Sequence, residues 1–319
     1  MTRVLIDQDI TPTDRLLESL PDDWEATVGV EGEEETLLDV VAEYEVLLVT
    51  SRIPLTRTVI EAADRLELIG KLGTGIDSVD LQAARDHGVT VTHTPGHNAL
   101  SVAEHAMTLT LACARRLPTA RELLSGGRWR DEYPLGTQLS GSTIGVIGFG
   151  NVGKRVGKLF SGFDVDLLVA DPYVPSIDAE LTDATPNSLG EVLERSDVVI
   201  LAPELTEETR GLIGRDELAR MKPTAILVNV SRGPVVDEAA LVEALEGGEI
   251  GAAGLDVFAD EPLDRQSPLL AFDTVVTTPH IAAMTATCRH GNIDQLTENV
   301  TRLTEGEPVL DRYVPVRDE

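Results

Sequence analysis

Residues 143–153 read TIGVIGFGNVG, and this stretch decides the fold. A run of small and β-branched apolar residues ends at Gly148, and two further glycines, Gly150 and Gly153, lie where a helix-like stretch opens. Glycine allows a tight turn and lets the backbone approach a pyrophosphate, which then lies on the N–H groups of a helix N-terminus. The stretch therefore predicts a strand, a phosphate-binding turn and a helix that together hold a dinucleotide.

An acidic residue at the end of the next strand-like run indicates which dinucleotide is bound. Asp171 lies 18 residues beyond Gly153 and follows the run Asp166–Ala170. A carboxylate at this place accepts hydrogen bonds from the adenosine ribose and repels a 2′-phosphate, so NAD is favoured over NADP. The alternative is that the glycines only shape a turn and that Asp171 caps the strand.

Short β-branched runs alternate with helix-like stretches on both sides of this turn. The strand-like runs are Val4–Asp7, Ala26–Val30, Val46–Thr50, Leu68–Leu72 and Val89–Thr92 before it, and Asp166–Ala170, Val198–Leu201, Ile226–Val230, Ala252–Val257 and Val275–Thr278 after it. Parallel strands need helical crossovers, so the alternation predicts an α/β fold with parallel sheets.

Several helices and their ends can also be predicted. The stretches Thr11–Asp14 and Pro54–Thr56 are expected to start helices with threonine caps. A long apolar helix is expected over Ser101–Leu117, closed by Pro118, and a last helix runs from Met284 to about Leu303. The acidic run Glu31–Glu35 is expected to form a solvated face or a helix start, to which we assign no binding role.

Length and composition exclude several classes of protein. The 319 residues suit two domains, and 42% of them are apolar without any run near the ~18 residues that cross a bilayer. The first residues show no secretory signal, and two cysteines, Cys113 and Cys288, exclude a disulfide scaffold. We therefore expect a cytoplasmic protein without a membrane partner, in which Cys113 belongs to a helix core.

The chain is strongly acidic. It has 55 Asp and Glu against 26 Lys and Arg, a formal net charge of −29. Such a surface repels phosphate backbones, which argues against a nucleic-acid partner. Our hypothesis is a salt-rich, halophilic cytoplasm, where charges are screened within ~3 Å at 1 M salt; the alternative is an ordinary acidic protein.

The salt hypothesis has a direct test. We expect the protein to unfold in low-salt buffer and to be stable in molar KCl, because only concentrated salt screens the repulsion among its carboxylates. Circular dichroism melting at both salt concentrations measures this difference. Equal stability in the two buffers contradicts the hypothesis.

Three residues that each follow a strand-like run carry complementary chemistry. They are Arg232, Glu261 and His280. Ligands of open α/β sheets bind outside the carboxyl ends of strands, so all three can converge on one crevice. A guanidinium holds a carboxylate, an imidazole moves a proton near neutral pH, and a carboxylate orients the imidazole. Each also has a plain alternative: a surface ion pair, a turn residue and a loop histidine.

A metal site is not expected. Four histidines, His87, His93, His97 and His105, fall on a helix end, a strand, a loop and a helix, without tight ligand spacing and without a nearby cysteine.

Several segments carry, in chain order, a resemblance to a known family. They are Leu72–Asp77, Ser101–His105, Gly148–Gly153, Val228–Asp237, Gly254–Phe258 with Glu261-Pro262, and Thr278–His280. Together they resemble the D-isomer-specific 2-hydroxyacid dehydrogenases over nearly the whole chain. The resemblance implies an NAD-dependent oxidoreductase that transfers a hydride between nicotinamide and C2 of a D-2-hydroxy acid or its 2-oxo acid.

The resemblance also implies a domain organisation. A Rossmann NAD-binding domain of residues 99–285 is inserted into a flavodoxin-like substrate-binding domain of residues 1–98 and 286–319, with hinges at the helices after Asn98 and Met284. A homodimer is implied too. The apolar face of Ser101–Leu117 fits a dimer contact, although a buried core helix gives the same pattern.

The roles of single residues follow from the same resemblance. Arg232 is expected to bind the substrate carboxylate and 2-oxo group together with the N–H groups of Thr74 and Gly75, while Glu261 pairs with the acid/base His280. The residues expected to contact the cofactor are Thr74, Gly148, Gly150, Asn151, Val152, Gly153, Asp171, Pro203, Val230, Ser231 and Asp256, the last at the nicotinamide amide.

Two departures bear on substrate choice and on the cofactor loop. Where the family has a His-x-Pro-Leu-Thr stretch, this chain has Ala202 and Glu204 at the His and Pro positions, which puts the loop around Pro203 in doubt. The sequence of residues 73–80 resembles that of the phosphoglycerate dehydrogenase branch, yet a chain of 319 residues is not expected to include the regulatory domains of that branch. Arg52 is a candidate for a distal anionic group such as a phosphate, or only a surface arginine.

Two functional alternatives therefore stay open beside D-3-phosphoglycerate. One is a glyoxylate or hydroxypyruvate reductase, and another is a non-enzymatic dinucleotide-sensing interaction protein on the same fold. Formate dehydrogenases are also relatives, but Glu261 fits 2-hydroxy acids better, because the formate pattern has a glutamine there.

Overall fold

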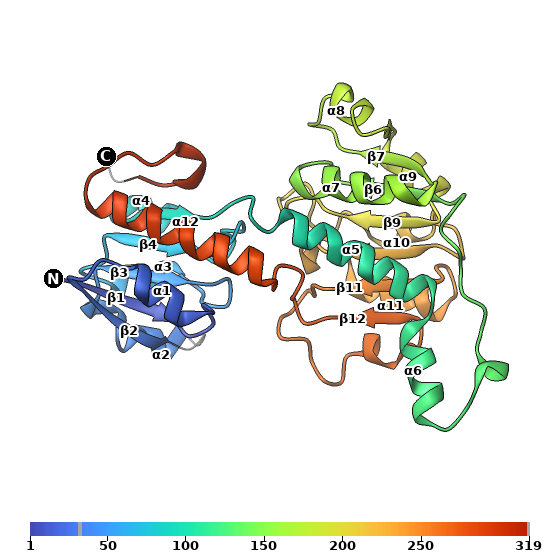
Figure 1. Ribbon diagram of the computed structural model, residues 1–319, viewed down its shortest axis with the longest axis horizontal. Coiled ribbons are helices and arrows are strands. Elements are labelled where there is room, and N and C mark those ends of the chain that lie inside the picture. Colours follow the sequence, from blue (N-terminus) through green and yellow to red (C-terminus); the bar gives the residue numbers. More distant parts are fainter. Residues whose placement is uncertain (31–33, 318–319) are drawn as a thin grey trace. The chain divides into compact units, whose positions relative to one another are not determined.

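The computed structural model describes residues 1–30 and 34–317. It divides into two compact units: unit 1 comprises residues 1–98 and 284–319, and unit 2 comprises residues 99–283 (Figure 1). The expected division has its second boundary two residues later, after residue 285. Each unit is built around its own parallel sheet, so each is described by itself.

Unit 1 contains a five-stranded sheet in the order β2-β1-β3-β4-β5. Its strands are β1 (Thr2–Asp7), β2 (Trp24–Val30), β3 (Val46–Val49), β4 (Leu68–Lys71) and β5 (Thr90–His93), and every neighbouring pair is parallel. This is the strand order of flavodoxin-like folds. The sheet is parallel because a helical crossover follows each short apolar strand and brings the chain back to the end of the sheet where the strands begin.

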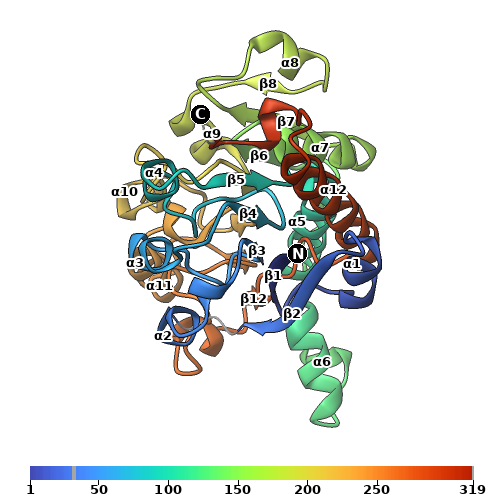
Figure 2. The same cartoon turned by 90° about the vertical axis from the view of Figure 1, so that its left-hand side faces the viewer.

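Helices cover both faces of this sheet. They are α1 (Thr13–Ser19), α2 (Glu34–Leu38), α3 (Arg57–Ala62), α4 (Leu81–Asp86) and α12 (Ala286–Thr304). Figure 2 shows α1 and α12 on one face and α2, α3 and α4 on the other. On the first face, Ile293, Leu296 and Val300 of α12 pack with Val4 and Ile6 of β1. The last helix is therefore part of the core formed by the first strand.

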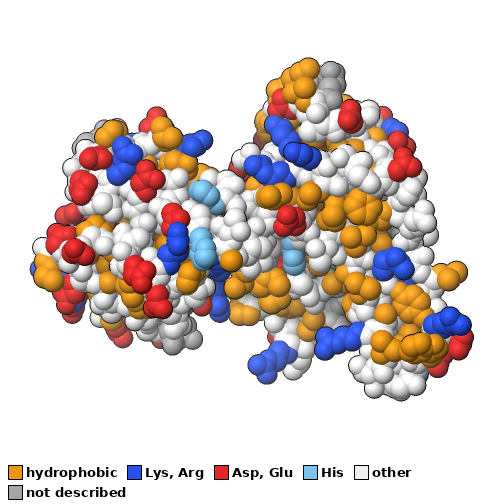
Figure 3. Space-filling view, viewed as in Figure 1, with side chains coloured by type: hydrophobic (Ala, Val, Ile, Leu, Met, Phe, Trp, Pro, Cys, Tyr) orange, Lys and Arg blue, Asp and Glu red, His pale blue; other side chains and the backbone are white. Residues whose placement is uncertain are grey.

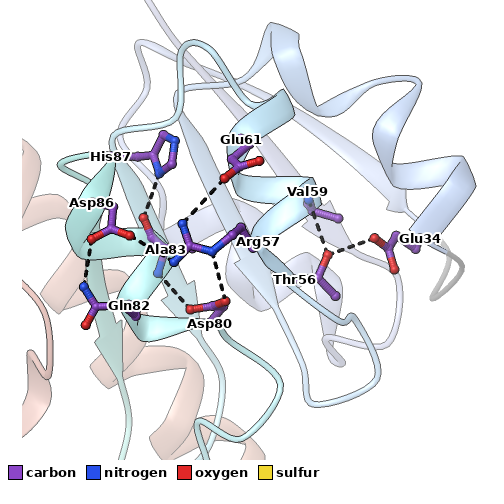
Figure 4. A network of polar contacts seen from close by, with 10 residues as sticks. All are labelled: Glu34, Thr56, Arg57, Val59, Glu61, Asp80, Gln82, Ala83, Asp86 and His87. Carbon is purple, nitrogen blue, oxygen red and sulfur yellow. Dashed lines mark hydrogen bonds and ion pairs between the residues drawn. The ribbon is translucent and has the colours of Figure 1, made fainter.

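Two helix starts of unit 1 show where capping was predicted well and where it was not. The Thr56 hydroxyl accepts the N–H of Val59 and caps α3, as expected (Figure 4). At α1 the N-cap is Pro12 without a side-chain hydrogen bond, so the threonine cap predicted there is wrong. The Thr13 hydroxyl instead donates to the carbonyl of Ile10.

On the surface of unit 1, one arginine, Arg57, pairs with several carboxylates. Arg57 lies within ion-pair distance of the carboxylates of Glu61, Asp80 and Asp86 (Figure 4). Of the acidic run Glu31–Glu35, only its last two residues are described, and α2 begins at Glu34. The rest of that prediction lies outside the described residues.

Unit 2 contains a seven-stranded sheet in the order β12-β11-β10-β9-β6-β7-β8, in which every neighbouring pair is parallel. Its strands are β6 (Thr143–Ile147), β7 (Asp166–Ala170), β8 (Thr185–Pro186), β9 (Val198–Leu201), β10 (Ile226–Asn229), β11 (Ala252–Leu255) and β12 (Val275–Thr277). The order reverses between β6 and β9, as in Rossmann folds. The predicted α/β class with a Rossmann and a flavodoxin-like sheet is confirmed.

Helices cover both faces of the second sheet as well. They are α5 (Ala99–Ala114), α6 (Leu117–Ser125), α7 (Asn151–Phe160), α8 (Ser176–Glu180), α9 (Leu189–Arg195), α10 (Arg215–Leu218) and α11 (Glu238–Glu246). Buried residues of α5 and α7 share one core cluster, and buried residues of α9, α10 and α11 share the other. The short elements α8 and β8 were not predicted.

The predicted helix Ser101–Leu117 is found as α5, but it ends three residues earlier, at Ala114, and Leu117 already begins α6. Arg116, at φ 45°, separates α5 from α6, and Pro118 lies in the first turn of α6. Proline is tolerated there because its missing N–H would have no helical partner. The apolar face of α5, with Val102, Leu109 and Cys113, packs into the core of unit 2, so the buried-core alternative describes it and it provides no evidence for a dimer contact.

Within residues 1–30 and 34–317, no helix is both long enough and apolar enough to cross a membrane.

Candidate active site

The glycine turn after β6 is shaped by close backbone contacts. Gly148 has φ +86°, and a Cβ on it would lie 2.4 Å from the nitrogen of Pro203, in the loop that follows β9. A Cβ on Gly153 would lie 2.2 Å from the carbonyl oxygen of Gly148. Two of the three glycines are therefore required by the protein's own packing at the point where the strand order reverses.

The third glycine borders open space. A Cβ on Gly150 would meet no heavy atom within 4 Å, and Gly150 is the N-cap of α7. The N–H groups of Asn151, Val152 and Gly153 precede the first hydrogen bond of α7, which Lys154 donates to the carbonyl of Gly150 at 3.1 Å, so they have no intrahelical acceptor. This open cradle, with free donors at the positive end of a ten-residue helix, fits a dinucleotide pyrophosphate.

Asp171 holds the turn by accepting three backbone hydrogen bonds. Its Oδ2 accepts the N–H of Phe149 at 2.7 Å, and its Oδ1 accepts the N–H groups of Tyr173 and Val174 at 2.9 and 3.2 Å. A carboxylate has about four lone-pair sites, so one remains for a ribose hydroxyl. The structure thus shows the strand-capping role, and the ribose contact stays a prediction.

The loop after β10 presents Arg232 from a rigid backbone. The side-chain amide of Asn229 donates to the Arg232 carbonyl at 3.0 Å, and its oxygen accepts both the N–H and the hydroxyl of Ser231. A Cβ on Gly233 would lie 1.8 Å from the carbonyl carbon of Phe258, so this loop is packed tightly against the loop after β11. Val230 and Ser231, predicted to contact the cofactor, are buried at the strand end.

His280 and Glu261 form a hydrogen-bonded pair. The distance between His280 Nδ1 and Glu261 Oε2 is 2.7 Å, and the two side chains are 40% and 36% exposed. Burial alone would raise the pKa of the Glu261 carboxyl, but the hydrogen bond and charge of His280, the N–H of Phe258 and the charge of Arg232 hold this pKa below its ordinary value. Glu261 is therefore ionised at neutral pH and orients the ring so that Nε2 is the atom left for proton transfer.

The backbone of His280 is unusual and is held from Asp256. His280 has φ +53°, a left-handed conformation that few non-glycine residues adopt. Its N–H donates to the carbonyl of Asp256 at 2.8 Å, and the Asp256 carboxylate accepts the N–H groups of Ile281 and Ala282 at 2.9 Å each. Such strained residues persist where the surrounding contacts over-determine them, and they cluster at functional sites.

The carboxylate of Asp256 has a structural task. Its side chain is 1% exposed and also accepts the Thr278 hydroxyl at 2.6 Å. Burial alone would raise its pKa, but the donors around it, from His105 to Ala282, hold this pKa below the ordinary value. The predicted contact to the nicotinamide amide stays a prediction; what the structure shows is an anchor for the His280 loop.

The predicted substrate residues of unit 1 lie near the ends of β3 and β4. Thr74 accepts the N–H of Gly96 and donates to Asn98 Oδ1 at 2.9 Å, which fixes the loop that includes Gly75. Arg52 forms an ion pair with Asp9 at 2.7 Å, and its side chain is 70% exposed. The guanidinium proposed for a phosphate thus has a carboxylate partner.

Sequence reasoning missed two polar residues. Lys71, at the end of the buried strand β4, is fully buried and donates to the Ser51 hydroxyl at 2.7 Å. Thr278 contacts both Asp256 and His105. The sequence could have indicated Lys71, because a lysine at the end of an apolar strand places a positive charge at the carboxyl ends of the strands, where ligands bind. Among the described residues, no group of His, Cys, Asp or Glu could hold a metal ion.

Comparison with known proteins gives a consistent picture. Residues 107–282 match a family described as D-isomer specific 2-hydroxyacid dehydrogenase, NAD binding domain. A D-3-phosphoglycerate dehydrogenase of Archaeoglobus fulgidus is 40% identical over 275 residues, which cover 86% of this chain and 52% of that protein. The chain thus spans about half the length of this relative. A hydroxypyruvate reductase of Thermotoga maritima is 42% identical over 258 residues, which cover 80% of this chain and 83% of that protein.

Solved structures resemble the chain over nearly its whole length. The TT0316 protein of Thermus thermophilus has a TM-score of 0.86 and 35% identity, covering 96% of this chain and 97% of that one. An NAD-dependent formate dehydrogenase of Staphylococcus aureus, solved with NAD, has a TM-score of 0.88 and 27% identity, covering 99% and 100%.

Proposed function

Because the chain belongs to the D-isomer-specific 2-hydroxyacid dehydrogenase family, we propose that it is an NAD-dependent oxidoreductase acting on the CH–OH group of a D-2-hydroxy acid. The observation that carries the proposal is the pair of His280 and Glu261, 2.7 Å apart, with the charge of Arg232 acting on the same carboxylate. A dinucleotide sensor has no need of a proton-transfer pair beside a carboxylate-binding arginine.

The residues divide the chemistry among them. The Arg232 guanidinium binds the substrate carboxylate and the C2 oxygen. In the oxidation direction, Nε2 of His280 takes the proton of the C2 hydroxyl as the C2 hydride leaves, and Glu261 stabilises the imidazolium that forms. In reduction, the same nitrogen returns the proton to the ketone oxygen. NAD, when bound, supplies the hydride acceptor, and NADH the donor.

The remaining predicted contacts are carried forward as part of the proposal. The N–H groups of Thr74 and Gly75 bind the substrate carboxylate. The Asp171 carboxylate accepts hydrogen bonds from the adenosine ribose and disfavours a 2′-phosphate; its position beside the glycine turn, where it accepts the N–H of Phe149, supports this role. Pro203 lies along the cofactor, which its contact with Gly148 supports, even though Ala202 and Glu204 replace the family's usual residues.

For the substrate we propose a small unphosphorylated 2-oxo acid such as glyoxylate or hydroxypyruvate. The support is the 42% identity with a hydroxypyruvate reductase, of which the match covers 83%. In addition, Arg52, the residue expected to hold a phosphate, has Asp9 as a carboxylate partner. D-3-Phosphoglycerate and its oxo acid are the second candidate, supported by the identity with phosphoglycerate dehydrogenases.

A substrate panel tests both candidates. We expect NADH oxidation at molar KCl to be fastest with glyoxylate or hydroxypyruvate, slower with phosphohydroxypyruvate, and weak with NADPH. Arg52→Ala is expected to change KM for each acid by less than about 2-fold, since an exposed ion pair contributes little. If phosphohydroxypyruvate is preferred and Arg52→Ala raises its KM far more than that of glyoxylate, the phosphorylated substrate is correct. Absence of activity with every acid favours the sensing alternative.

We also propose that the protein acts in the cytoplasm as a homodimer, with a small-molecule acid and no nucleic acid or membrane as its partners. Exposed apolar side chains on α6 and on the segment after it support the dimer. They are Leu117, Leu124, Trp129 and Leu135, and Figure 3 shows hydrophobic side chains on the surface in this region.

A further inference from the structure

A histidine outside the proposed catalytic pair contacts the loop that carries His280. His105 lies on α5, and its side chain is 16% exposed. Its Nε2 lies 2.9 Å from the Thr278 hydroxyl oxygen and 3.3 Å from Asp256 Oδ1. All of these residues belong to unit 2.

The hydrogen atoms available in this cluster fix who donates to whom. A threonine hydroxyl has one proton, and the Thr278 hydroxyl uses it for the short 2.6 Å bond to Asp256 Oδ1. The contact with His105 must therefore be donated by Nε2–H of the histidine. The same N–H points toward two acceptors, Thr278 and Asp256, and holds them together.

The cluster bears directly on the conformation of His280. Thr278 precedes His280 by two residues, and its carbonyl accepts the His280 N–H at 3.0 Å, while the Asp256 carbonyl accepts the same N–H at 2.8 Å. Asp256 also receives the N–H groups of Ile281 and Ala282 on the other side of His280. Residues that hold the left-handed turn at His280 are thus the residues to which His105 donates.

We propose that His105 is a positioning residue: through Thr278 and Asp256 it holds the loop in which His280 faces its substrate. This inference rests on the proposed function, because it assigns His280 to proton transfer. Without the Nε2–H donor, the Thr278 oxygen loses the donor it accepts from, while the buried Asp256 carboxylate keeps the Thr278 hydroxyl and two backbone N–H groups. A lost hydrogen bond to a buried acceptor weakens the contacts that fix the loop. The loop then shifts, and a misplacement of about 1 Å in a reacting group can lower the rate about 100-fold.

Three variants test the proposal. His105→Leu removes the donor, His105→Gln keeps an N–H at a similar reach, and Thr110→Val is the matched control. The Thr110 hydroxyl is buried on the same helix and bonds only within it, to the carbonyl of Ala106, so its loss perturbs α5 without affecting the loop. We expect His105→Leu to lower kcat about 10- to 100-fold with KM and the NADH Kd within about 2-fold, and His105→Gln to recover most of kcat.

Amide hydrogen exchange gives a second readout that needs no activity. We expect the amides of His280, Ile281 and Ala282 to exchange about 10-fold faster in His105→Leu and to be unchanged in Thr110→Val. The proposal is overturned if exchange of these amides is unchanged, if Thr110→Val loses as much kcat as His105→Leu, or if His105→Gln recovers nothing. An inactive wild type with faster exchange in His105→Leu would instead reject the proposed function and keep the structural link.

Discussion

Replacing His280 with asparagine is expected to lower kcat for 2-oxo acid reduction by about 10²- to 10⁴-fold, because an amide cannot give or take a proton at neutral pH. Asparagine suits this position better than alanine. It tolerates the left-handed conformation at φ +53°, and its amide can still donate to the Glu261 carboxylate. The variant should therefore fold normally and lose only the proton transfer.

Two measurements accompany the rate. The NADH Kd, followed by fluorescence, is expected to stay within about 2-fold of wild type, since the proposal assigns His280 to the substrate and the start of α7 to the pyrophosphate. The melting temperature is expected to be unchanged. A His280→Asn variant that keeps its activity within a few-fold would show that another group transfers the proton.

Replacing Arg232 with alanine is expected to lower kcat/KM for the oxo acid by about 10²- to 10³-fold, the usual loss when one partner of a hydrogen-bonded charge pair is removed. The backbone around Arg232 is fixed by Asn229 and by the contact of Gly233 with Phe258, so the change removes the guanidinium and leaves the loop in place. Arg232→Lys keeps the charge but loses the planar fork, and an intermediate loss is expected.

The matched control for this change is Arg215→Ala. Arg215 lies in the same unit, is exposed and forms an ion pair with Glu243 away from the site, so its loss is expected to change kcat/KM by less than about 2-fold. Equal losses in Arg232→Ala and Arg215→Ala would mean that the net positive charge matters and the fork does not. An effect of Arg232→Ala confined to the NADH Kd would place this arginine at the cofactor.

Local sequence patterns predict the sheets of this protein well and the helix ends less well. Glycines 148 and 153 mark the turn after β6 because the loop after β9 and the strand itself leave no room for a Cβ. Pro118, in contrast, is compatible both with ending one helix and with starting the next. The structure uses it in the second way, with the break at Arg116, because a proline in a first turn loses no hydrogen bond.

The residues of the candidate site also fall into two groups: those that the sequence indicates and those whose contacts only the structure reveals. The spacing after strand-like runs makes Arg232, Glu261 and His280 candidates only, and the family resemblance assigns their roles. The structure shows the pairing of His280 with Glu261. The partners of Asp256 cannot be named in that way. His105 and Thr278 are 173 positions apart, and a lone histidine in an apolar helix gives no sign of which loop it contacts. The distance between Arg52 and Asp9 is likewise a tertiary fact that no pattern predicts.

Unit 1 is formed by two segments that are far apart in the sequence, and this affects how the chain folds during translation. The five strands of its sheet leave the ribosome first, yet Ile293, Leu296 and Val300, which cover one face of that sheet, are made only after the whole of unit 2. Unit 2 is continuous and can complete its core before they appear. For most of translation, this face of the N-terminal sheet therefore has only its α1 cover and lacks α12, and apolar surface exposed in this way favours aggregation before the chain is complete.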